Sequence, residues 1–363
     1  MTELDVVIVN WNGGSLLRDC LAGIAASEGA ERIAVSVVDN ASTDTSLDGL
    51  PALPGPFRLI RNGENLGFGR ACNQGAAAGT APAILFLNPD ARVEPDTLVC
   101  ARAALLVEPG WGIVGARLRE ADGTTARSCA RAPTPAGMLG RAFALDRLGL
   151  ARPHFMREWD HETDRAVDQV MGAFLMIRRD LFAALGGFDE RFFVYYEDVD
   201  LCLRAREAGY AVRHLAGPSA RHLGQGTTRQ ARARRLFYIL RSEILYAGKH
   251  HGRAVALALT ASAFGAQIPL RLTQALLRRS PAEAREVLRA ACLLAAALPE
   301  ILSGLRAGST PPRGAGRFRR ACLSPHKNEP DAARTENHRR PACLQRGGDP
   351  RTHPRRDPLR HRR

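Results

Sequence analysis

The 363-residue sequence lacks the cysteine spacings of a metal-binding or disulfide-stabilised domain. Its eight cysteines are scattered, with no CxxC pair and no Cys/His pair at zinc-ligand spacing. It also lacks a Walker A lysine motif, a GxSxG motif and a GxGxxG motif in its first strand-helix unit. These absences argue against a zinc domain, the commonest phosphoryl-transfer enzymes and hydrolases, and nicotinamide-dependent enzymes.

The amino terminus lacks the basic segment, the apolar segment and the small-residue cleavage site of a signal peptide. The overall composition, 45% hydrophobic and 24% charged residues, is that of a globular protein. We therefore predict a cytoplasmic protein.

The formal net charge of +14 comes mostly from the last part of the chain. Residues 311–363 hold 15 of the 51 Lys and Arg, which leaves 36 basic against 32 acidic residues in 1–310. The same segment has no Val, Ile, Met, Trp or Tyr, so we predict a disordered basic tail. The tail is either a polybasic arm or a non-functional extension. Its composition resembles that of a gene translated in a shifted reading frame. Because the sequence contains no recognisable nucleic-acid-binding module, we predict no nucleic-acid partner.

Short apolar runs alternate with helical patterns in the first part of the chain, which predicts an α/β fold with a parallel sheet. The predicted buried strands are 4–9, 33–38, 57–60 and 83–87, and the helices between them are 15–27 and 69–79. Further along, we predict a strand at 171–177 and helices at 179–185 and 199–208. Residues 110–170 are expected to form loops and short strands.

Residues 229–306 have a helical pattern in which basic side chains adjoin apolar stretches. The basic residues are Arg232, Arg234, Arg235 and Arg241, and the apolar stretches are 254–272 and 287–302. The first stretch contains Gln267 and Pro269, which favours helices on a membrane surface over a true span. We predict attachment to the inner face of the plasma membrane; a helical subdomain packed on the core is the alternative.

Polar clusters follow each of the first four predicted strands. They are Asn10–Asn12, Asp39–Asp44, Asn65–Gly69 and Asn88–Asp90. Any one of them could be an ordinary turn or helix cap. Because ligands of α/β sheets bind beyond the carboxyl ends of the strands, four clusters at one edge predict a nucleotide site.

These clusters and three later motifs resemble family 2 glycosyltransferases, in particular the bacterial rhamnosyltransferase-like branch. The motifs are Val7–Asn12, Val38–Asp44, Asn65–Gly69 with Ala71–Asn73, Phe86–Asp90, Gly172–Arg179, Gly186–Asp189 and Tyr196–Arg204. They follow one another in the family's order over about 220 residues. The resemblance implies a GT-A fold, which is a Rossmann-like nucleotide-binding sheet flanked by helices. We assign this catalytic domain to residues 1–228, a helical region to 229–310 and the tail to 311–363.

The resemblance also implies which residues bind the donor, a nucleoside diphosphate sugar. Asp39 would recognise the nucleobase, and Asp90 would hold a Mg²⁺ or Mn²⁺ ion on the diphosphate, with His222 as a second ligand. Asn88 stands where the family usually has another carboxylate. The further donor-binding candidates are Asn10, Asn12, Asn40, Asn65, Gly67, Asn73 and Asn88.

Two acidic residues, Glu197 and Asp198, are the candidates for catalysis. On their own they would be read as acidic residues that stabilise the start of a helix. Within the family motif, Asp198 becomes the candidate general base and Glu197 a residue that orients the acceptor.

We therefore predict an inverting glycosyltransferase that moves a sugar to a glycan or lipid-linked acceptor in cell-surface polysaccharide synthesis. The resemblance to the rhamnosyltransferase-like branch suggests that this sugar is rhamnose. A transferase that uses a UDP-hexose is one alternative. The other is a nucleotide-sugar-binding protein without activity, because the metal motif has only one carboxylate.

Overall fold

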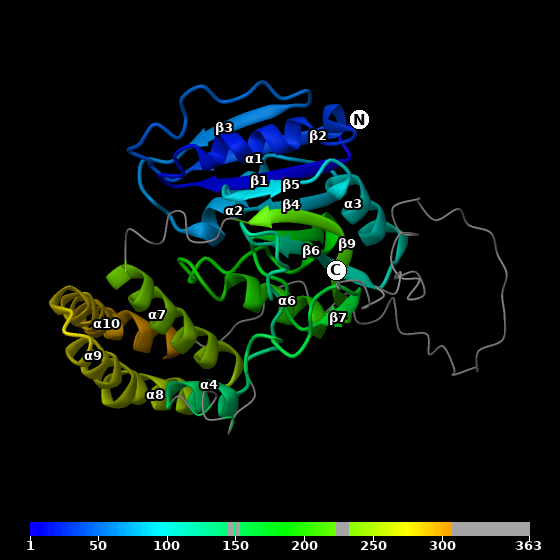
Figure 1. Ribbon diagram of the computed structural model, residues 1–363. Helices are drawn as coiled ribbons and strands as arrows, with labels where there is room; N and C mark the ends of the chain where they lie inside the picture. The colour runs from blue at the N-terminus through cyan, green and yellow to red at the C-terminus, as the bar shows by residue number, and fades with distance from the viewer. Residues whose placement is uncertain (144, 146–148, 150–152, 223–231, 307–363) are drawn as a thin grey trace, which may run out of the picture.

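A single mixed β-sheet of nine strands organises the structure, a computed structural model (Figure 1). It describes residues 1–143, 145, 149, 153–222 and 232–306. The strand order is β3-β2-β1-β4-β8-β6-β9-β5, and β7 pairs with β9. The strands are β1 (Leu4–Asn10), β2 (Ile33–Asp39), β3 (Phe57–Arg61), β4 (Ala83–Leu87), β5 (Ala91–Val93), β6 (Trp111–Arg119), β7 (Arg165–Val167), β8 (Phe174–Arg178) and β9 (Ala211–His222).

The first four predicted strands form the parallel part of this sheet, as expected. β1 pairs in parallel with β2 and β4, and β2 pairs in parallel with β3. The sheet becomes mixed beyond β4, because β8 runs antiparallel to both β4 and β6. The expectation that residues 57–60 are buried was wrong, because β3 is the edge strand and its side chains are partly or fully exposed.

Side chains of β1 alternate between two cores, one on each face of the sheet. Leu4, Val6 and Ile8 pack toward α1 (Leu16–Ala25) and α3 (Thr97–Val107). Val7 and Val9 pack on the opposite face, with α2 (Phe68–Ala77), α5 (Arg179–Ala184) and α6 (Glu197–Glu207). The helices predicted around 15–27, 69–79, 179–185 and 199–208 are thus confirmed. A 3₁₀ turn, η1 (Ala30–Arg32), precedes β2. The predicted α/β fold, with its sheet flanked by helices, is confirmed in the described residues.

The region 110–170 contains more regular structure than expected. Residues Trp111–Arg119 form β6, which lies inside the sheet, and α4 (Pro135–Ala142) follows. Gly112 and Gly115 obscure β6 in the sequence, yet both are required by packing. A Cβ on Gly112 would lie 2.5 Å from Leu181 Cδ2, and one on Gly115 would lie 2.7 Å from Val170 Cβ. Glycine in a strand interior often marks such a close approach.

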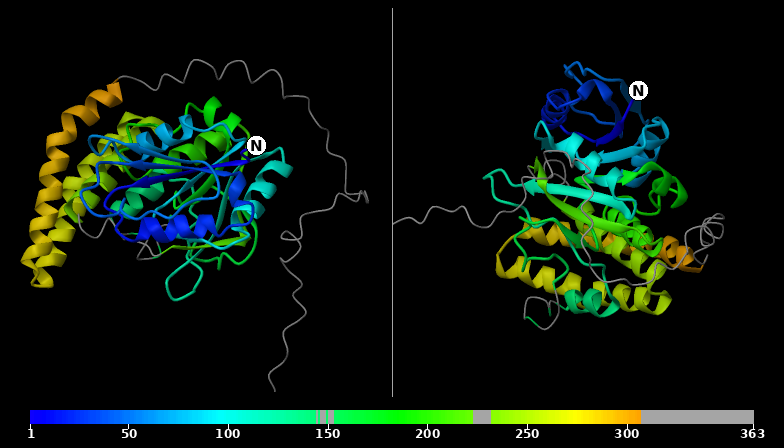
Figure 2. Two further views of the ribbon diagram at one scale, coloured as in Figure 1. Left: turned by 90° about the horizontal axis from the view of Figure 1, so that it is seen from above. Right: turned by 90° about the vertical axis from the view of Figure 1, so that its right-hand side faces the viewer.

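Helices follow in the carboxyl-terminal part, as predicted for residues 229–306. They are α7 (Arg232–His250), α8 (Arg253–Ser262), a π turn η3 (Ala263–Gln267), α9 (Ile268–Leu277) and α10 (Pro281–Arg306). They pack with α4 around a third core and lie together on one side of the sheet (Figure 2). By length and composition alone, Arg253–Leu277 and Pro281–Gly304 could each cross a membrane, which is weak evidence that either does. The predicted boundary at 228/229 and the tail 311–363 lie outside the described residues.

Buried charges join α7 to the segment that contains the predicted catalytic residues. Asp200, which is fully buried, accepts hydrogen bonds from Arg204 Nε at 2.7 Å and His250 Nε2 at 2.7 Å. Lys249 Nζ lies 2.6 Å from the same carboxylate and 2.7 Å from Asp189 Oδ2. Burial alone would raise the pKa of Asp200, but the hydrogen bond of His250 and the charges of Arg204 and Lys249 lower it overall.

Replacement of Lys249 by Met should destabilise the protein on the order of 3 kcal/mol, because it leaves a buried carboxylate with less compensation. The pKa of Asp200 is lower in the folded chain. Its contribution is therefore present above the unfolded pKa, about 4, and is lost as the pH falls through the folded value. Urea denaturation at pH 7 and at acidic pH measures both effects. Arg253→Met, which removes an exposed cation from the start of α8, is the control and should have little effect.

Candidate active site

The polar clusters predicted to bind a nucleotide meet at one edge of the sheet. β1 to β4 are parallel, so their carboxyl ends lie together, and Asn10 at the end of β1 pairs in register with Asp39 at the end of β2. Asn12, Asn40, Asn65, Gly67, Asn88 and Asp90 follow in the loops after these strands. In Figure 1 the arrowheads of β1, β3 and β9 point toward the side where α7 begins.

Asn10 and Asp39 form a buried pair at the centre of this edge. Asn10 Nδ2 donates to Asp39 Oδ1 at 2.8 Å and to Ser46 Oγ at 2.8 Å. Asp39 also accepts from Ser42, through Oγ at 2.6 Å and through the backbone N–H at 3.1 Å. The carboxylate is therefore held in one orientation. Asn10 Oδ1 is buried and has no hydrogen-bond partner in the described part of the chain, which is unusual for a buried amide.

Asn12 and Asp44 connect the loops after β1 and β2. Asn12 has a left-handed backbone, with φ of 51°, and its Oδ1 accepts from the Thr43 N–H at 2.7 Å. Asp44 accepts from the Gly14 N–H at 2.8 Å and from Ser46 Oγ at 2.6 Å. Burial alone would raise the pKa of Asp44, but these hydrogen bonds lower it overall. The two loops are thus closed on each other before any ligand binds.

A ladder of side-chain amides supports the next loop. Asn62 Nδ2 donates to Asn40 Oδ1 and to Gln74 Oε1, both at 2.9 Å. Asn40 Nδ2 in turn donates to the Gly67 carbonyl at 3.1 Å, and Asn65 Oδ1 accepts from the Gly67 N–H at 3.0 Å. Gly67 has φ of 87°, a conformation that favours glycine.

Asn73 lies on α2 and holds another loop. Its Nδ2 donates to the Phe188 carbonyl and to Glu190 Oε1, each at 3.0 Å, and its Oδ1 accepts from the Phe188 N–H at 2.9 Å. These bonds position the Gly186–Asp189 motif. The contact of Asn73 with a donor stays a prediction.

Asp90 and His222, which are 132 positions apart, meet at this edge. β5 and β9 pair antiparallel with Ala91 opposite His222, and His222 Nε2 lies 3.3 Å from Asp90 Oδ1. Two ligands bound to one ion at right angles would have donor atoms roughly 3 Å apart, so this spacing fits a shared divalent cation. Asn88 contributes its backbone, donating to the Ala173 carbonyl at 3.1 Å. In the described residues, no third His, Cys, Asp or Glu completes a cluster.

Glu197 and Asp198 begin α6, as the helix-capping alternative also requires. Asp198 Oδ2 accepts from the Gly172 N–H at 2.9 Å, and its Oδ1 accepts from the Val199 N–H at 2.8 Å. Burial raises the pKa of Asp198 despite these bonds. Burial and then the neighbouring Asp198 charge raise the pKa of Glu197, whose Oε2 is buried without a partner in the described chain.

The acid pair and the metal-binding candidate converge on two adjacent residues. Gly172 donates to Asp198, and the next residue, Ala173, accepts from Asn88 in the turn that carries Asp90. The described backbone therefore joins a carboxylate of raised pKa to the end of β4. The candidate base Asp198 and the candidate metal ligand Asp90 are thus close enough in the fold to act on one substrate.

Two tyrosines that sequence analysis overlooked set the direction of the acid pair. Tyr195 and Tyr196 have φ of 67° and 69°, a left-handed conformation that costs a non-glycine residue about 1–2 kcal/mol. Tyr196 accepts from Arg141 Nη2 at 3.2 Å and donates to Glu243 Oε1 at 3.3 Å. Such strain is characteristic of functional sites. No local sequence signal marks it, because tyrosine is not a residue expected in this conformation.

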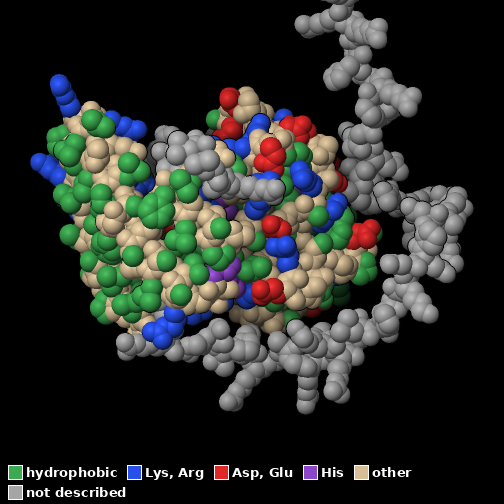
Figure 3. Space-filling model, turned by 90° about the horizontal axis from the view of Figure 1, so that it is seen from below, with side chains coloured by type: hydrophobic (Ala, Val, Ile, Leu, Met, Phe, Trp, Pro, Cys, Tyr) green, Lys and Arg blue, Asp and Glu red, His purple; other side chains and the backbone are tan. Residues whose placement is uncertain are grey.

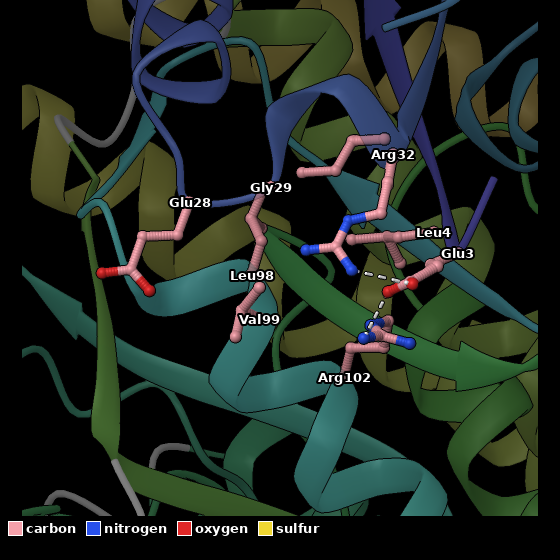
Figure 4. Close-up of a pocket in the computed structure, with 9 residues that line it drawn as sticks. Glu3, Leu4, Glu28, Gly29, Arg32, Leu98, Val99 and Arg102 are labelled. Atoms are coloured by element: carbon pink, nitrogen blue, oxygen red, sulfur yellow. Dashed lines mark hydrogen bonds and ion pairs between the residues drawn. The ribbon is translucent and has the colours of Figure 1, made fainter. Parts of the chain in front are cut away.

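A surface pocket lies at the opposite edge of the sheet, near the amino ends of β1 and β2 (Figure 4). Its charged groups already pair with one another. Glu3 interacts with Arg32 at 3.0 Å and with Arg102 at 2.5 Å. This pocket is remote from the loops described above and brings none of the predicted site residues together.

Comparisons with known proteins identify the family of this chain. Glycosyl transferase family 2 matches residues 5–186, and Glycosyl transferase family group 2 matches residues 136–302. The chain is 30% identical over 274 residues to N-acetylglucosaminyl-diphospho-decaprenol L-rhamnosyltransferase of Mycobacterium tuberculosis, covering 69% of this chain and 87% of that protein. It is 32% identical over 84 residues to Rhamnosyltransferase WbbL of Escherichia coli K12, covering 23% of this chain and 32% of that protein.

Among solved structures, the mannosyltransferase PcManGT from Pyrobaculum calidifontis, in complex with GDP-Man and Mn²⁺, aligns with a TM-score of 0.47 and 18% identity. The alignment covers 84% of this chain and 79% of that one. The family match spans half of the sequence, and the mycobacterial relative is matched over most of its length. The chain therefore belongs to glycosyl transferase family 2 and is a glycosyltransferase.

Proposed function

We propose that this enzyme transfers rhamnose, with inversion, from a nucleoside diphosphate donor to a lipid-linked sugar acceptor during cell-surface polysaccharide synthesis. The observation that carries the proposal is the junction at Gly172 and Ala173, where the base candidate Asp198 meets the turn of Asp90. The similarity to a rhamnosyltransferase over 87% of that protein supports the sugar and the acceptor class. In this proposal the catalytic domain comprises residues 1–228.

The donor lies across the carboxyl ends of β1 to β4. Asp39 recognises the nucleobase. Hydrogen bonds from Asn10 and Ser42 orient the Asp39 carboxylate for this contact. The loop at Asn65 and Gly67 closes over the ribose and diphosphate.

A divalent cation, Mg²⁺ or Mn²⁺, would be held by Asp90 and His222, with donor oxygens and water as its other ligands. When bound, it neutralises the charge that develops on the departing diphosphate. A single carboxylate suffices in this arrangement because the imidazole supplies a second ligand.

Asp198 acts as the general base of a direct displacement. Its carboxylate accepts the proton of the acceptor hydroxyl as that oxygen bonds to the anomeric carbon. The bond from the same carbon to the diphosphate breaks, and the diphosphate leaves with the electron pair. The raised pKa makes Asp198 a stronger base than an exposed aspartate, and Glu197 orients the acceptor.

We further propose that α8 to α10 attach the enzyme to the inner membrane surface. Hydrophobic side chains gather over the helical part of the molecule, with Lys and Arg at its margins (Figure 3). The exposed leucines are Leu257, Leu270, Leu276, Leu277, Leu288 and Leu293. Arg241 is not available to lipid, because it pairs with Glu300 at 2.6 Å. Sedimentation with anionic vesicles, and not with neutral ones, tests this proposal; recovery only in the supernatant contradicts it.

The proposed activity predicts that a nucleoside diphosphate rhamnose binds and is consumed. In a thermal-shift screen of donors that differ in base and sugar, a ligand at 100 times its dissociation constant should stabilise the fold by about 2.7 kcal/mol. Transfer of labelled sugar to a polyprenyl-diphosphate sugar measures turnover. Preference for a UDP-hexose would replace the donor assignment, and binding without transfer or hydrolysis would identify a silent nucleotide-sugar-binding protein.

Replacement of Asp198 by Asn should preserve donor binding and reduce the transfer rate on the order of 10²- to 10⁴-fold, because the amide cannot accept the proton. In the parent enzyme, the rate should fall with decreasing pH at a higher pH than an ordinary aspartate would dictate, since the pKa is raised. Asp180→Asn is the matched control. Asp180, whose side chain is exposed, makes the same local bond to the next N–H, at 2.8 Å, at the start of α5. Equal turnover of the two variants would remove Asp198 from the role of base.

Replacement of Asp90 by Ala should weaken divalent-ion and donor binding together, and His222→Ala should do so more mildly. Isothermal titration with Mn²⁺ in the presence of donor measures the effect without relying on turnover. Asp96→Ala, which removes an exposed carboxylate before α3, is the control. If EDTA leaves transfer by the parent enzyme unchanged, the metal assignment is wrong and basic side chains must neutralise the diphosphate.

A further inference from the structure

A stacked aromatic pair connects α7 to the segment that leads into the acid pair. The rings of Phe193 and Tyr238 are 4.5 Å apart between centroids and 9° from parallel, and both side chains are only partly buried. Phe193 precedes the left-handed tyrosines by two residues and Asp198 by five. The pair is therefore on the chain's approach to the proposed base.

The same pair borders the donor-binding edge. The Phe193 carbonyl accepts from the Phe68 N–H at 2.7 Å. Gly67 packs so closely that a Cβ there would lie 2.9 Å from Cδ2 of the Phe193 ring. The Gly67 carbonyl is in turn bound by Asn40 after β2. Phe193 thus lies between the loop at Gly67 and α7.

Two arginines lie beside the aromatic pair, both on α7. Arg234 and Arg235 lie four and three residues before Tyr238 on α7, so they are its neighbours on the helix surface. Both are exposed, and neither pairs with a carboxylate within the described chain. Arg241, one turn later, differs, because Glu300 and the Arg191 carbonyl engage it.

We propose that this surface is the acceptor site, in which the acceptor sugar packs on the outer face of the Phe193–Tyr238 stack while Arg234 and Arg235 bind its diphosphate. The inference rests on the proposed function and extends it to the chemistry of the acceptor. A pyranose presents an apolar C–H face that packs on an aromatic ring, and its hydroxyls remain free at the rim. Guanidinium groups match the geometry of phosphate oxygens. Sugar and diphosphate are adjacent in such an acceptor, as Tyr238 and the two arginines are on α7.

The test compares two soluble acceptors that carry the same sugar, one on a short-chain alkyl diphosphate and one on the alkyl chain alone. Tyr238→Leu should raise the KM for both acceptors about tenfold, and Tyr238→Phe should restore it because the ring remains. The double variant Arg234→Gln, Arg235→Gln should raise the KM about tenfold for the diphosphate acceptor only. The donor KM and the slow hydrolysis of donor by water should be unchanged in all three.

The control double variant Arg253→Gln, Arg279→Gln removes two exposed charges of the same helical region and should behave as the parent. Lipid-free assays separate the acceptor's diphosphate from an anionic membrane as the source of any charge effect. An unchanged acceptor KM in both Tyr238→Leu and the arginine variant would overturn the inference, as would an equal rise in the donor KM. If Tyr238→Leu fails to fold, the acceptor KM of the arginine variant alone tests the inference. Absence of transfer by the parent enzyme to either acceptor would overturn the proposed function itself, and the inference with it.

Discussion

The buried carboxylate of Asp200 is the point on which the arrangement of this enzyme depends. It lies one turn into α6, pairs with Arg204 of its own helix and with Lys249 of α7, and accepts a hydrogen bond from His250 of α7. A charge buried in this way is strongly destabilising unless its partners remain in place. The carboxyl-terminal helices are therefore held against the segment that contains the candidate catalytic residues by an interaction that α6 alone satisfies only in part.

This constraint explains how a strained backbone persists beside the acid pair. Two consecutive left-handed tyrosines are unfavourable, and they are retained where surrounding contacts determine them. Glu243 and Arg141 bind the Tyr196 hydroxyl, and Ser242 donates to the Val194 carbonyl at 2.9 Å. α7 thus has three roles. It fixes the segment before Asp198 and stabilises the start of α6. It also presents the aromatic and basic surface that we assign to the acceptor.

Much of the donor side could be predicted because its determinants are local. Apolar runs that end in polar residues identify β1 to β4, and parallel strands bring their carboxyl ends together, so the clusters beginning at Asn10 and Asp39 were expected to meet. The Asp90 and His222 pair came only from the family resemblance. Their contact depends on the antiparallel pairing of β5 with β9, which spans 132 positions. β6 was missed because its glycines weaken the strand pattern, although packing against Leu181 and Val170 requires them.

By itself, the sequence determined the α/β class and the family, and it predicted the nucleotide edge and the candidate base, since each of these is read from short ordered motifs with fixed spacing. Only the tertiary structure decided that Lys249 pairs with Asp200 and His250 hydrogen-bonds to it, that Tyr195 and Tyr196 are left-handed, and that Phe193 stacks on Tyr238. The physical reason is that these features belong to contacts between segments about 45 to 50 positions apart. The charge, strain and ring stacking of each residue are stabilised by partners that no local pattern specifies.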